Sequence, residues 1–480
     1  MQDYKMWIGG EWVNSVSGKT FDTLNPATEE RLSRVPLSGQ VDVDKAVSAA
    51  RKAFSSWSRM KQSDRSKKVS QIAAAIRENV DDLAAIETLE HGTPVSDARG
   101  MIMYAAEILD YTAGAARSLM GEFVPAVPDV VTYLQRVPVG VCALIIPWNV
   151  PLLLMAVKLG PAIATGNTCV IKPPSINSGI GLKFAEVLSK VDLPPGVINV
   201  ITGPGGSVGN ALASHPDIDL IGMTGSSETG KTIMSVASQT VKRLVMELGG
   251  NNPVLVLKDA DIDAVVKLLS FRQFNNAGMH CSGPGRYYLH ESIHDEFMEK
   301  FVAAARAVVV GDPRDPKTTM GPVVSAEHRD KLEYYFKTGF KQGAKAVIGG
   351  SRPVNPPLNR GFYVMPTVFT DVTHDMTLAK EEKFGPVACL LKFSSEEEVI
   401  KLANDSQYGL CAAVWTRDMR KGMRFVRELQ AGTVFVNTHM LTPELPWGGG
   451  VKESGIGKEG SIVGMQEFTE VKMVCLNMAE

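Results

Sequence analysis

The feature that most limits the possible folds is a repeated alternation of short apolar segments with helical ones, which begins at Val141. Uniformly apolar segments of about five residues are typical of strands buried on both faces of a parallel sheet. The predicted strands are 141–146, 168–172, 197–201, 220–224 and 242–247, and the predicted helices are 151–164, 178–190, 207–213 and 230–239. This order predicts a doubly wound α/β domain.

A second alternation runs from Pro253 to about Thr442 and predicts another α/β unit. Its strands are expected at 253–257, 286–289, 387–393, 412–415 and 433–437. Upstream, two β segments (6–13 and 21–24, with a turn between them) precede helices at 42–57, 63–79, 81–91 and 94–119. Residues 121–139 are β-rich and punctuated by proline, so we expect them to leave the preceding layer.

Composition excludes several classes of protein. The 480 residues allow two or three domains, and a net charge of −2 without a long basic run argues against nucleic-acid or membrane-surface binding. Six scattered cysteines without a CxxC pair argue against a disulfide framework and against a metal site. No apolar leader or membrane-spanning window is present, so we expect a cytoplasmic protein.

One cysteine has the surroundings of a reactive thiol. Cys281 lies among Gly278, Gly283 and Gly285, which leave the backbone open to close approach. A buried packing cysteine normally lies in an apolar run instead. A single cysteine of an intracellular protein is nevertheless more often inert than catalytic, so this stretch alone does not decide the matter.

Three polar residues follow predicted strands of the first unit: Asn149, Lys172 and Glu247. Each has an ordinary interpretation, as a helix cap, a solvated loop lysine and an edge glutamate. Parallel strands can nevertheless bring such residues together at one edge of the sheet. Further on, Glu382 and Phe384 could bind ribose hydroxyls and stack on a ring, or simply form a charged turn.

Residues 225–232 match the phosphate-binding pattern G-x-x-x-x-G-K-[ST] between a predicted strand and helix. A P-loop NTPase is therefore one alternative. Against it, Glu228 would place a carboxylate inside a phosphate loop, and this strand would be the fourth of its sheet. The helix N-terminus could instead hold a pyrophosphate. Residues 203–209 fail the G-x-G-x-x-G pattern at Val208, and we expect a loop there that lines a cofactor.

Taken in order, the quoted motifs resemble those of the NAD(P)-dependent aldehyde dehydrogenase superfamily over nearly the whole chain. They are 147–149, 172–173, 225–230, 247–250, 278–281, 382–386 and 446–449. The resemblance implies a cofactor domain (1–120 and 140–247), a catalytic domain (248–445) and a small β oligomerisation element (121–139 and 465–480). It also implies homodimers or homotetramers. An inactive relative with a structural role is a further alternative.

The resemblance implies oxidation of an aldehyde to a carboxylic acid through a thiohemiacetal and a thioester on Cys281. Glu247 would be the general base, and Asn149 with the Cys281 N–H would form the oxyanion hole. Ser175 stands where the family often has glutamate, so NAD and NADP are both plausible. The expected cofactor-binding residues are Ile146, Pro147, Trp148, Lys172, Ser175, Gly205, Gly209, Thr224, Gly225, Ser226, Leu248, Glu382 and Phe384.

Helical spacing places aliphatic side chains on one face of the helix after Asn149, and if that face points at the aldehyde tunnel that the resemblance implies, the tunnel wall is aliphatic. The expected pocket residues are Val150, Leu153, Leu154 and Val157 on that face, with His280, His439 and Trp447 elsewhere. Glu444 and the Trp447 ring would make the mouth favourable to cations, unless Glu444 is an ordinary solvated loop residue. His280 and an additional glycine within 448–450 depart from the family pattern.

Overall fold

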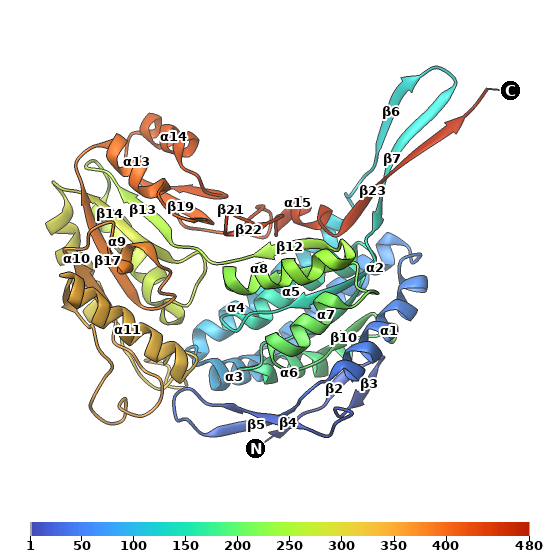
Figure 1. Cartoon of the computed structure of the whole chain (residues 1–480), viewed down its shortest axis with the longest axis horizontal. Coiled ribbons are helices and arrows are strands. Elements are labelled where there is room, and N and C mark those ends of the chain that lie inside the picture. Colours follow the sequence, from blue (N-terminus) through green and yellow to red (C-terminus); the bar gives the residue numbers. More distant parts are fainter. Residues whose placement is uncertain (1, 480) are drawn as a thin grey trace.

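The computed structural model describes residues 2–479 and contains a doubly wound α/β layer as predicted (Figure 1). Its eight-stranded sheet has the order β22-β12-β11-β8-β9-β10-β2-β3. The five central strands, all parallel and buried, are β8 (Val141–Ile145), β9 (Thr168–Lys172), β10 (Ile198–Val200), β11 (Leu220–Thr224) and β12 (Arg243–Glu247).

Helices cover both faces of this sheet, which explains why most residues of its central strands are apolar and buried. Alternate residues of β8 enter different cores: Val141 and Ala143 pack on one face, and Cys142 and Leu144 on the other. The first face is covered by α1 (Gln40–Trp57), α7 (Asn210–Ser214) and α8 (Ser227–Ala237). The second is covered by α2 (Gln62–Glu78), α4 (Val95–Ala116), α5 (Pro151–Ala164) and α6 (Ser178–Leu188), with α3 (Val80–His91) beside them.

A second sheet of seven strands forms the other α/β unit, on the left of the molecule in Figure 1. Its order is β15 (Lys345–Ile348), β16 (Thr367–Thr370), β17 (Val387–Phe393), β14 (Pro284–His290), β13 (Asn252–Val256), β19 (Cys411–Trp415) and β20 (Thr433–Val436). Its helices are α9 (Ile262–Phe274), α10 (His294–Arg306), α11 (Ala326–Gln342), α12 (Thr377–Lys380), α13 (Glu396–Asn404) and α14 (Met419–Glu428).

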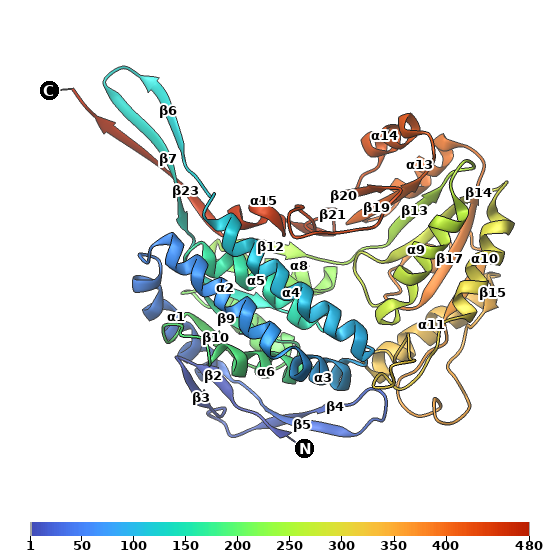
Figure 2. The same cartoon turned by 180° about the vertical axis from the view of Figure 1, so that it is seen from behind.

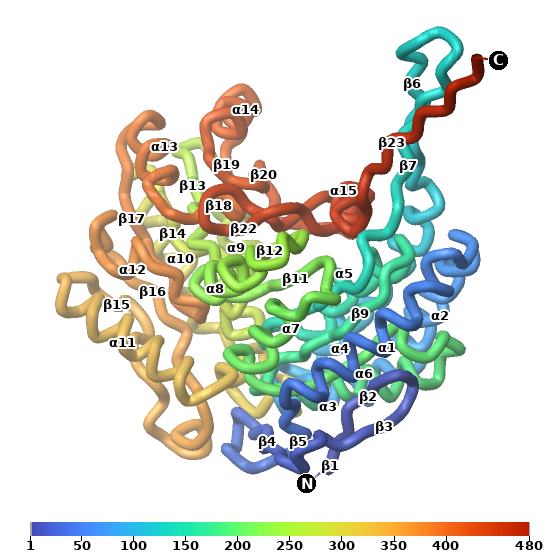
Figure 3. The backbone as a smooth tube through the Cα atoms, turned by 45° about the vertical axis from the view of Figure 1, so that its right-hand side comes forward, coloured from blue at the N-terminus to red at the C-terminus, as the bar shows by residue number. Residues whose placement is uncertain are grey.

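The end of the chain returns from the second unit to the first (Figure 3). After β18 (Tyr408–Gly409) has paired with β21 (Val451–Lys452), β22 (Gly455–Ile456) joins the first sheet antiparallel to β12. Helix α15 (Ser461–Gln466) then leads into β23 (Thr469–Asn477). This strand joins β7 (Val130–Pro138) and β6 (Glu122–Val127) in a three-stranded arm that projects from the body (Figures 1 and 2).

Two local predictions were wrong, and one strand was not predicted. Residues 6–13 form a hairpin, β2 (Met6–Ile8) and β3 (Glu11–Val13), because Gly9 and Gly10 both take positive φ values and turn the chain. The segment 21–24 lies in a separate sheet of β1 (Gln2–Asp3), β4 (Thr20–Leu24) and the unpredicted β5 (Arg31–Pro36), whose two arginines mask its alternation. The expected loop that holds Gly205 and Gly209 is a helical π turn leading into α7.

Candidate active site

Strand register brings the predicted site residues to one edge of the first sheet. Ile145 pairs with Lys172 across β8 and β9, and Thr224 pairs with Glu247 across β11 and β12. The segments that leave the carboxyl ends of these strands therefore begin side by side. They carry Ile146 to Asn149, Gly225 and Ser226, and Leu248, so the sheet gathers most of the predicted residues at one crevice.

Asn149 is buried and directed at the cysteine loop. Its side-chain amide Nδ2 donates to the carbonyl of Met279 at 3.1 Å, and its own carbonyl accepts from Asn276 Nδ2 at 3.0 Å. The N-cap of α5 is Val150 rather than Asn149, so the ordinary capping interpretation fails. One N–H of the Asn149 amide remains free to donate to a ligand.

Cys281 lies at the end of a turn with unusual backbone geometry. Asn276, Ala277 and Gly278 all have positive φ values, and the Cys281 carbonyl accepts from Asn252 Nδ2 at 2.8 Å. Burial, followed by the charges of Glu247 and Glu382, raises the pKa of the thiol to about 12. The resting side chain is therefore a neutral thiol at physiological pH.

Glu247 ends β12 as a buried carboxylate, and one of its oxygens lacks a hydrogen-bond partner. Burial and the nearby charge of Glu459 raise the pKa of Glu247 well above its usual range, against the opposing effects of Lys158 and the Gly449 N–H. A carboxylate whose pKa is raised in this way is suited to accept a proton near neutral pH.

The glycines at 448–450 are explained by this packing. A Cβ at Gly448 would lie 2.2 Å from a Glu247 oxygen, and one at Gly449 would lie 1.5 Å from the Gly457 carbonyl. At Gly450 a Cβ would approach the backbone of Gly409 and Leu410 to 2.7 Å. All three positions therefore exclude a side chain, so the additional glycine lets the chain pass close to the carboxylate.

Sequence reasoning missed a buried ion pair behind Glu247. Lys158 of α5 and Glu459 have side chains that are 0% and 2% exposed, and they form a direct ion pair. One Glu459 oxygen has no partner. The available signal was a lysine inside an otherwise apolar helix, because lysines are almost never fully buried unless they are paired.

The predicted cofactor residues surround the same edge. Lys172 is buried, its Nζ donates to the Pro173 and Gly203 carbonyls at 2.9 and 3.3 Å, and burial lowers its pKa to about 8. Ser226 caps α8, whose first-turn N–H groups form an anion-binding end. The Phe384 ring lies 5.3 Å from that of Trp148, while Ser175 is partly exposed.

Glu382 belongs to the same group, because its carboxylate accepts from the Gly250 N–H at 2.9 Å. A Cβ at Gly249 would lie 2.6 Å from that carboxylate, so glycine is needed there. A helix N-terminus for a pyrophosphate, a carboxylate for ribose hydroxyls and an aromatic ring together fit a dinucleotide. Lys231 of the P-loop-like segment instead pairs with Glu453 at 2.8 Å.

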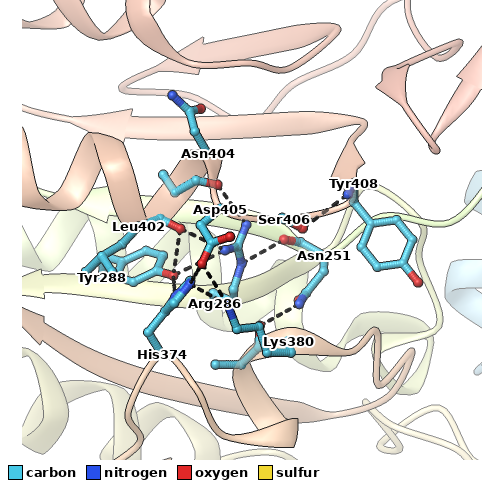
Figure 4. A network of polar contacts seen from close by, with 12 residues as sticks. Asn251, Arg286, Tyr288, His374, Lys380, Leu402, Asn404, Asp405, Ser406 and Tyr408 are labelled. Carbon is cyan, nitrogen blue, oxygen red and sulfur yellow. Dashed lines mark hydrogen bonds and ion pairs between the residues drawn. The ribbon is translucent and has the colours of Figure 1, made fainter.

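The segment after Glu247 is anchored by a buried arginine in the second unit (Figure 4). Arg286 of β14 donates to the Asn251 carbonyl at 2.9 Å and to the carbonyls of Leu402 and Ala403 at the end of α13. A cation that satisfies the last carbonyls of a helix is favourably placed. The network therefore fixes the segment that links Glu247 to the second sheet.

The predicted pocket residues occupy two neighbouring places. Val150, Leu154 and Val157 are buried and Leu153 is partly buried, and Val157 lines a small cavity together with Trp447. The His439 ring stacks on Phe435 at 4.6 Å, and His280 Nε2 lies 3.1 Å from Asn275 Oδ1. Glu444 is exposed, and its charge helps to raise the pKa of Tyr104 and Tyr111.

Comparison with known proteins agrees with this geometry. The chain matches the model of the aldehyde dehydrogenase family over residues 12–474. It belongs to the aldehyde dehydrogenase family. It is 41% identical to betaine aldehyde dehydrogenase of Bacillus subtilis (strain 168), over 98% of this chain and 97% of that protein. It is 42% identical to human mitochondrial aldehyde dehydrogenase, over 99% and 92% of the two chains.

Solved aldehyde dehydrogenase structures share the fold. The structure of betaine aldehyde dehydrogenase from Staphylococcus aureus in complex with NAD+ has a TM-score of 0.96 at 37% identity, over 99% of this chain and 95% of that one. A putative aldehyde dehydrogenase from Burkholderia cenocepacia has a TM-score of 0.98 at 36% identity, over 100% and 98%.

The protein is therefore an oxidoreductase that oxidises aldehydes with NAD(P)+. This confirms the predicted family, fold class and reaction. Nothing in the comparisons supports a P-loop NTPase or an inactive relative. Within residues 2–479, no helix is long and apolar enough to cross a membrane, and no group of three or more His, Cys, Asp or Glu side chains could hold a metal ion.

Proposed function

We propose that Cys281 is the nucleophile of this aldehyde dehydrogenase. The Cys281 thiol first releases its proton to solvent, the thiolate then attacks the aldehyde carbon, a C–S bond forms, and the carbonyl π electron pair moves onto oxygen. The free N–H of the Asn149 amide and the backbone N–H of Cys281 donate to that oxygen. The observation that carries this proposal is the direct hydrogen bond from Asn149 to Met279, two residues before the cysteine.

The residues that hold the cofactor are Lys172, Ser175, Ser226, Glu382 and Phe384. A nicotinamide held by these residues would supply the hydride acceptor, and loss of hydride from the carbon bonded to Cys281 would leave the acyl group as a thioester on that residue. Glu247 then removes a proton from water, whose oxygen attacks the thioester carbon while Asn149 again holds the oxyanion. The C–S bond breaks, the carboxylic acid leaves, and the thiolate is restored. Burial raises the pKa of Glu247, the charge of Glu459 raises it further, and the charge of Lys158 opposes them.

Replacing Cys281 tests the assignment. Cys281→Ala should lower aldehyde oxidation by several orders of magnitude, on the order of 10⁴-fold or more, because no other group replaces a covalent nucleophile. Absorbance at 340 nm with an aldehyde and NAD+ or NADP+ measures the rate. Cys411→Ala is the matched control, because Cys411 is buried in β19 nearby and its thiol approaches the carbonyl of Ser282. Near-normal turnover in Cys281→Ala would remove Cys281 from the mechanism.

For the substrate we propose aldehydes of medium chain length or aromatic aldehydes, with ω-amino aldehydes favoured at the mouth. The aliphatic side chains of α5 support the first part. The exposed Glu444 beside Tyr104 and Tyr111 supports the second, because a carboxylate and aromatic rings attract a cation. Two of the similar proteins carry the name betaine aldehyde dehydrogenase, which points in the same direction.

We also propose which function each part of the chain serves. Residues 1–120 with 140–247 bind the cofactor, 248–445 catalyse, and 121–139 with 465–480 join subunits into homodimers or homotetramers. The exposed apolar side chains of the arm support the last assignment. A cytoplasmic location is supported by six free cysteines, among which Cys142 and Cys169 are cross-strand neighbours that remain unbonded.

A further inference from the structure

The loop that presents Cys281 is wound in a conformation that its residues disfavour. Asn276 (φ 52°, ψ 33°) and Ala277 (φ 50°, ψ 31°) are left-handed, and Gly278 follows with φ 70°. Side chains with a Cβ rarely adopt this conformation, and two in succession are rarer still. Such a turn persists only where surrounding contacts determine it. The contacts that hold this one should therefore control the position of the nucleophile.

A chain of side-chain hydrogen bonds holds this turn and reaches the oxyanion asparagine. Thr93 Oγ1 donates to Asn276 Oδ1 at 2.8 Å, and Asn276 Nδ2 donates to the Asn149 carbonyl at 3.0 Å. Asn149 Nδ2 in turn donates to the Met279 carbonyl at 3.1 Å. Asn276 thus uses both ends of its amide, one toward Thr93 and the other toward Asn149. Thr93, Asn149 and Asn276 are all buried, so water does not compete for these bonds.

This series of hydrogen bonds begins at a histidine whose ring remains neutral. The Thr93 hydroxyl proton goes to Asn276, so His91 Nδ1, at 2.6 Å from Thr93 Oγ1, must be the donor. Burial and the neighbouring charge of His328 lower the pKa of His91 to about 3. The ring of His91 also stacks against Trp148, next to Asn149. The donor and the acceptor of every hydrogen bond in this series are therefore fixed at physiological pH.

A second hydrogen bond holds the cysteine loop to the segment of the first unit that contains Thr93. Asn275 Nδ2 donates to Asp97 Oδ2 at 2.7 Å, and Asn275 Oδ1 lies 3.1 Å from His280 Nε2. His91, Thr93 and Asp97 lie between the end of α3 and the first turn of α4, in the first α/β unit. The cysteine loop belongs to the second unit. Residues 91–97 of the first unit therefore hold the cysteine loop of the second unit next to Asn149.

We propose that Thr93 and Asn276 are positioning residues that align the Asn149 amide with Cys281, so that the oxyanion hole is assembled between the two units. This proposal rests on the assignment of Cys281 and Asn149 made above. Neither Thr93 nor Asn276 touches the aldehyde. Their contribution is to the placement of a donor that acts only when charge develops on the substrate oxygen.

Two reactions of Cys281 separate placement from thiol reactivity. Alkylation by iodoacetamide needs the thiolate but forms no oxyanion, whereas acylation by p-nitrophenyl acetate needs both the thiolate and the oxyanion hole. Thr93→Val keeps the shape and removes the hydroxyl. We expect it to lower the acylation rate about 10- to 100-fold, because misplacement of a donor by about 1 Å has effects of this size. The alkylation rate should stay within about twofold, since the thiol is untouched.

Asn276→Asp should act in the same way, because it removes the donor to the Asn149 carbonyl. Thr93→Ser keeps a hydroxyl and should restore the acylation rate. Thr165→Val is the matched control, because Thr165 is equally buried at the far end of α5 and bonds to helix carbonyls. If the Asn276 variant does not fold, the Thr93 series decides alone.

The outcomes are distinct. Equal losses of acylation and alkylation in Thr93→Val, or no loss of acylation, would overturn the positioning role. If Cys281 were not the nucleophile, the result would be different, because Cys281→Ala would then retain both alkylation and acylation. A selective loss of acylation in Thr93→Val that Thr93→Ser restores would establish the proposal.

Discussion

At the scale of single residues, the site depends on charges that burial has shifted. Cys281 is held as a neutral thiol and Glu247 as a carboxyl group with a raised pKa, and the charge of Glu247 helps to raise the pKa of Cys281. Neighbouring glycines and strand ends made both residues candidates, and the family resemblance supplied their expected roles. The sequence could not predict their protonation, because Lys158 and Glu459, which surround Glu247, lie far away along the chain.

Glu247→Gln should separate the two halves of the reaction. Acyl transfer to Cys281 needs no base at position 247, whereas attack by water does, so a burst of about one NAD(P)H per site should precede slow turnover. In the wild type, kcat should rise as the pH rises through the raised pKa of Glu247, because only the ionised form accepts a proton. The variant should lose this dependence.

Alkylation supplies the control for this variant. The ionised Glu247 raises the pKa of the Cys281 thiol, so its removal should lower that pKa and increase the thiolate fraction at pH 8. Iodoacetamide should then react faster with Glu247→Gln than with the wild type. Slower alkylation of Glu247→Gln would show that Glu247 takes the proton of the thiol itself. A wild-type rate of deacylation in this variant would show that another group is the base.

Ser175 should permit the use of both cofactors. It follows β9 close to Lys172 and carries no charge that would repel a 2′-phosphate. Ser175→Glu should lower kcat/KM for NADP+ about 10- to 100-fold while NAD+ is retained, because two negative groups would then meet. Ser189→Glu, at the exposed end of α6, should change neither value. Wild-type efficiency with NADP+ thousands of times below that with NAD+ would contradict the expectation.

At the scale of elements, the sequence predicted the buried strands well and the irregular segments poorly. The bounds of β9, β11, β17 and α5 agree with prediction, since uniform apolar runs between polar turns leave few alternatives. The turn 276–278 could not be predicted, because Ala277 has no local preference for the left-handed conformation, although Asn276 tolerates it. Contacts from Thr93, more than a hundred residues away, accompany that conformation.

The segment between β20 and β21 should contribute to substrate choice through Glu444. A cationic amino aldehyde gains attraction from this carboxylate, so Glu444→Gln should lower kcat/KM for it several-fold relative to an aliphatic aldehyde of equal length. An effect of about 3- to 5-fold is expected, because the side chain is exposed and screened by solvent. Glu299→Gln, an exposed glutamate of α10, is the control. An unchanged ratio of the two kcat/KM values would exclude Glu444 from substrate choice.

At the scale of the whole molecule, the proposed catalytic arrangement depends on how two α/β units meet. The first supplies Asn149, Glu247 and Lys172 from one sheet edge, and the second supplies Cys281. On the side of the second unit, Asn252 in β13 holds the Cys281 carbonyl, and Arg286 in β14 holds the connecting segment at Asn251. Sequence patterns predict each unit separately, but they carry no information about this meeting. Only the ordered motifs, through family resemblance, implied it.

The arm formed by β6, β7 and β23 gives the final prediction. Its outer strands have unpaired edges, and it exposes Val471 (54%) and Met473 (67%) to solvent. Unpaired strand edges and exposed apolar side chains are typical of a surface that another chain covers. We therefore expect Val471→Lys combined with Met473→Lys to reduce the assembly to smaller species, because burying two ammonium groups in an interface is costly.

Sedimentation velocity measures the outcome, and Val354→Lys combined with Met419→Lys is the matched control. These two side chains are equally exposed, at 78% and 59%, but lie in the second unit, far from the arm. The control should sediment like the wild type. Because every proposed catalytic residue belongs to the body of the subunit, the arm variant should still be alkylated at Cys281. A wild-type sedimentation coefficient for the arm variant would show that subunits join through another surface.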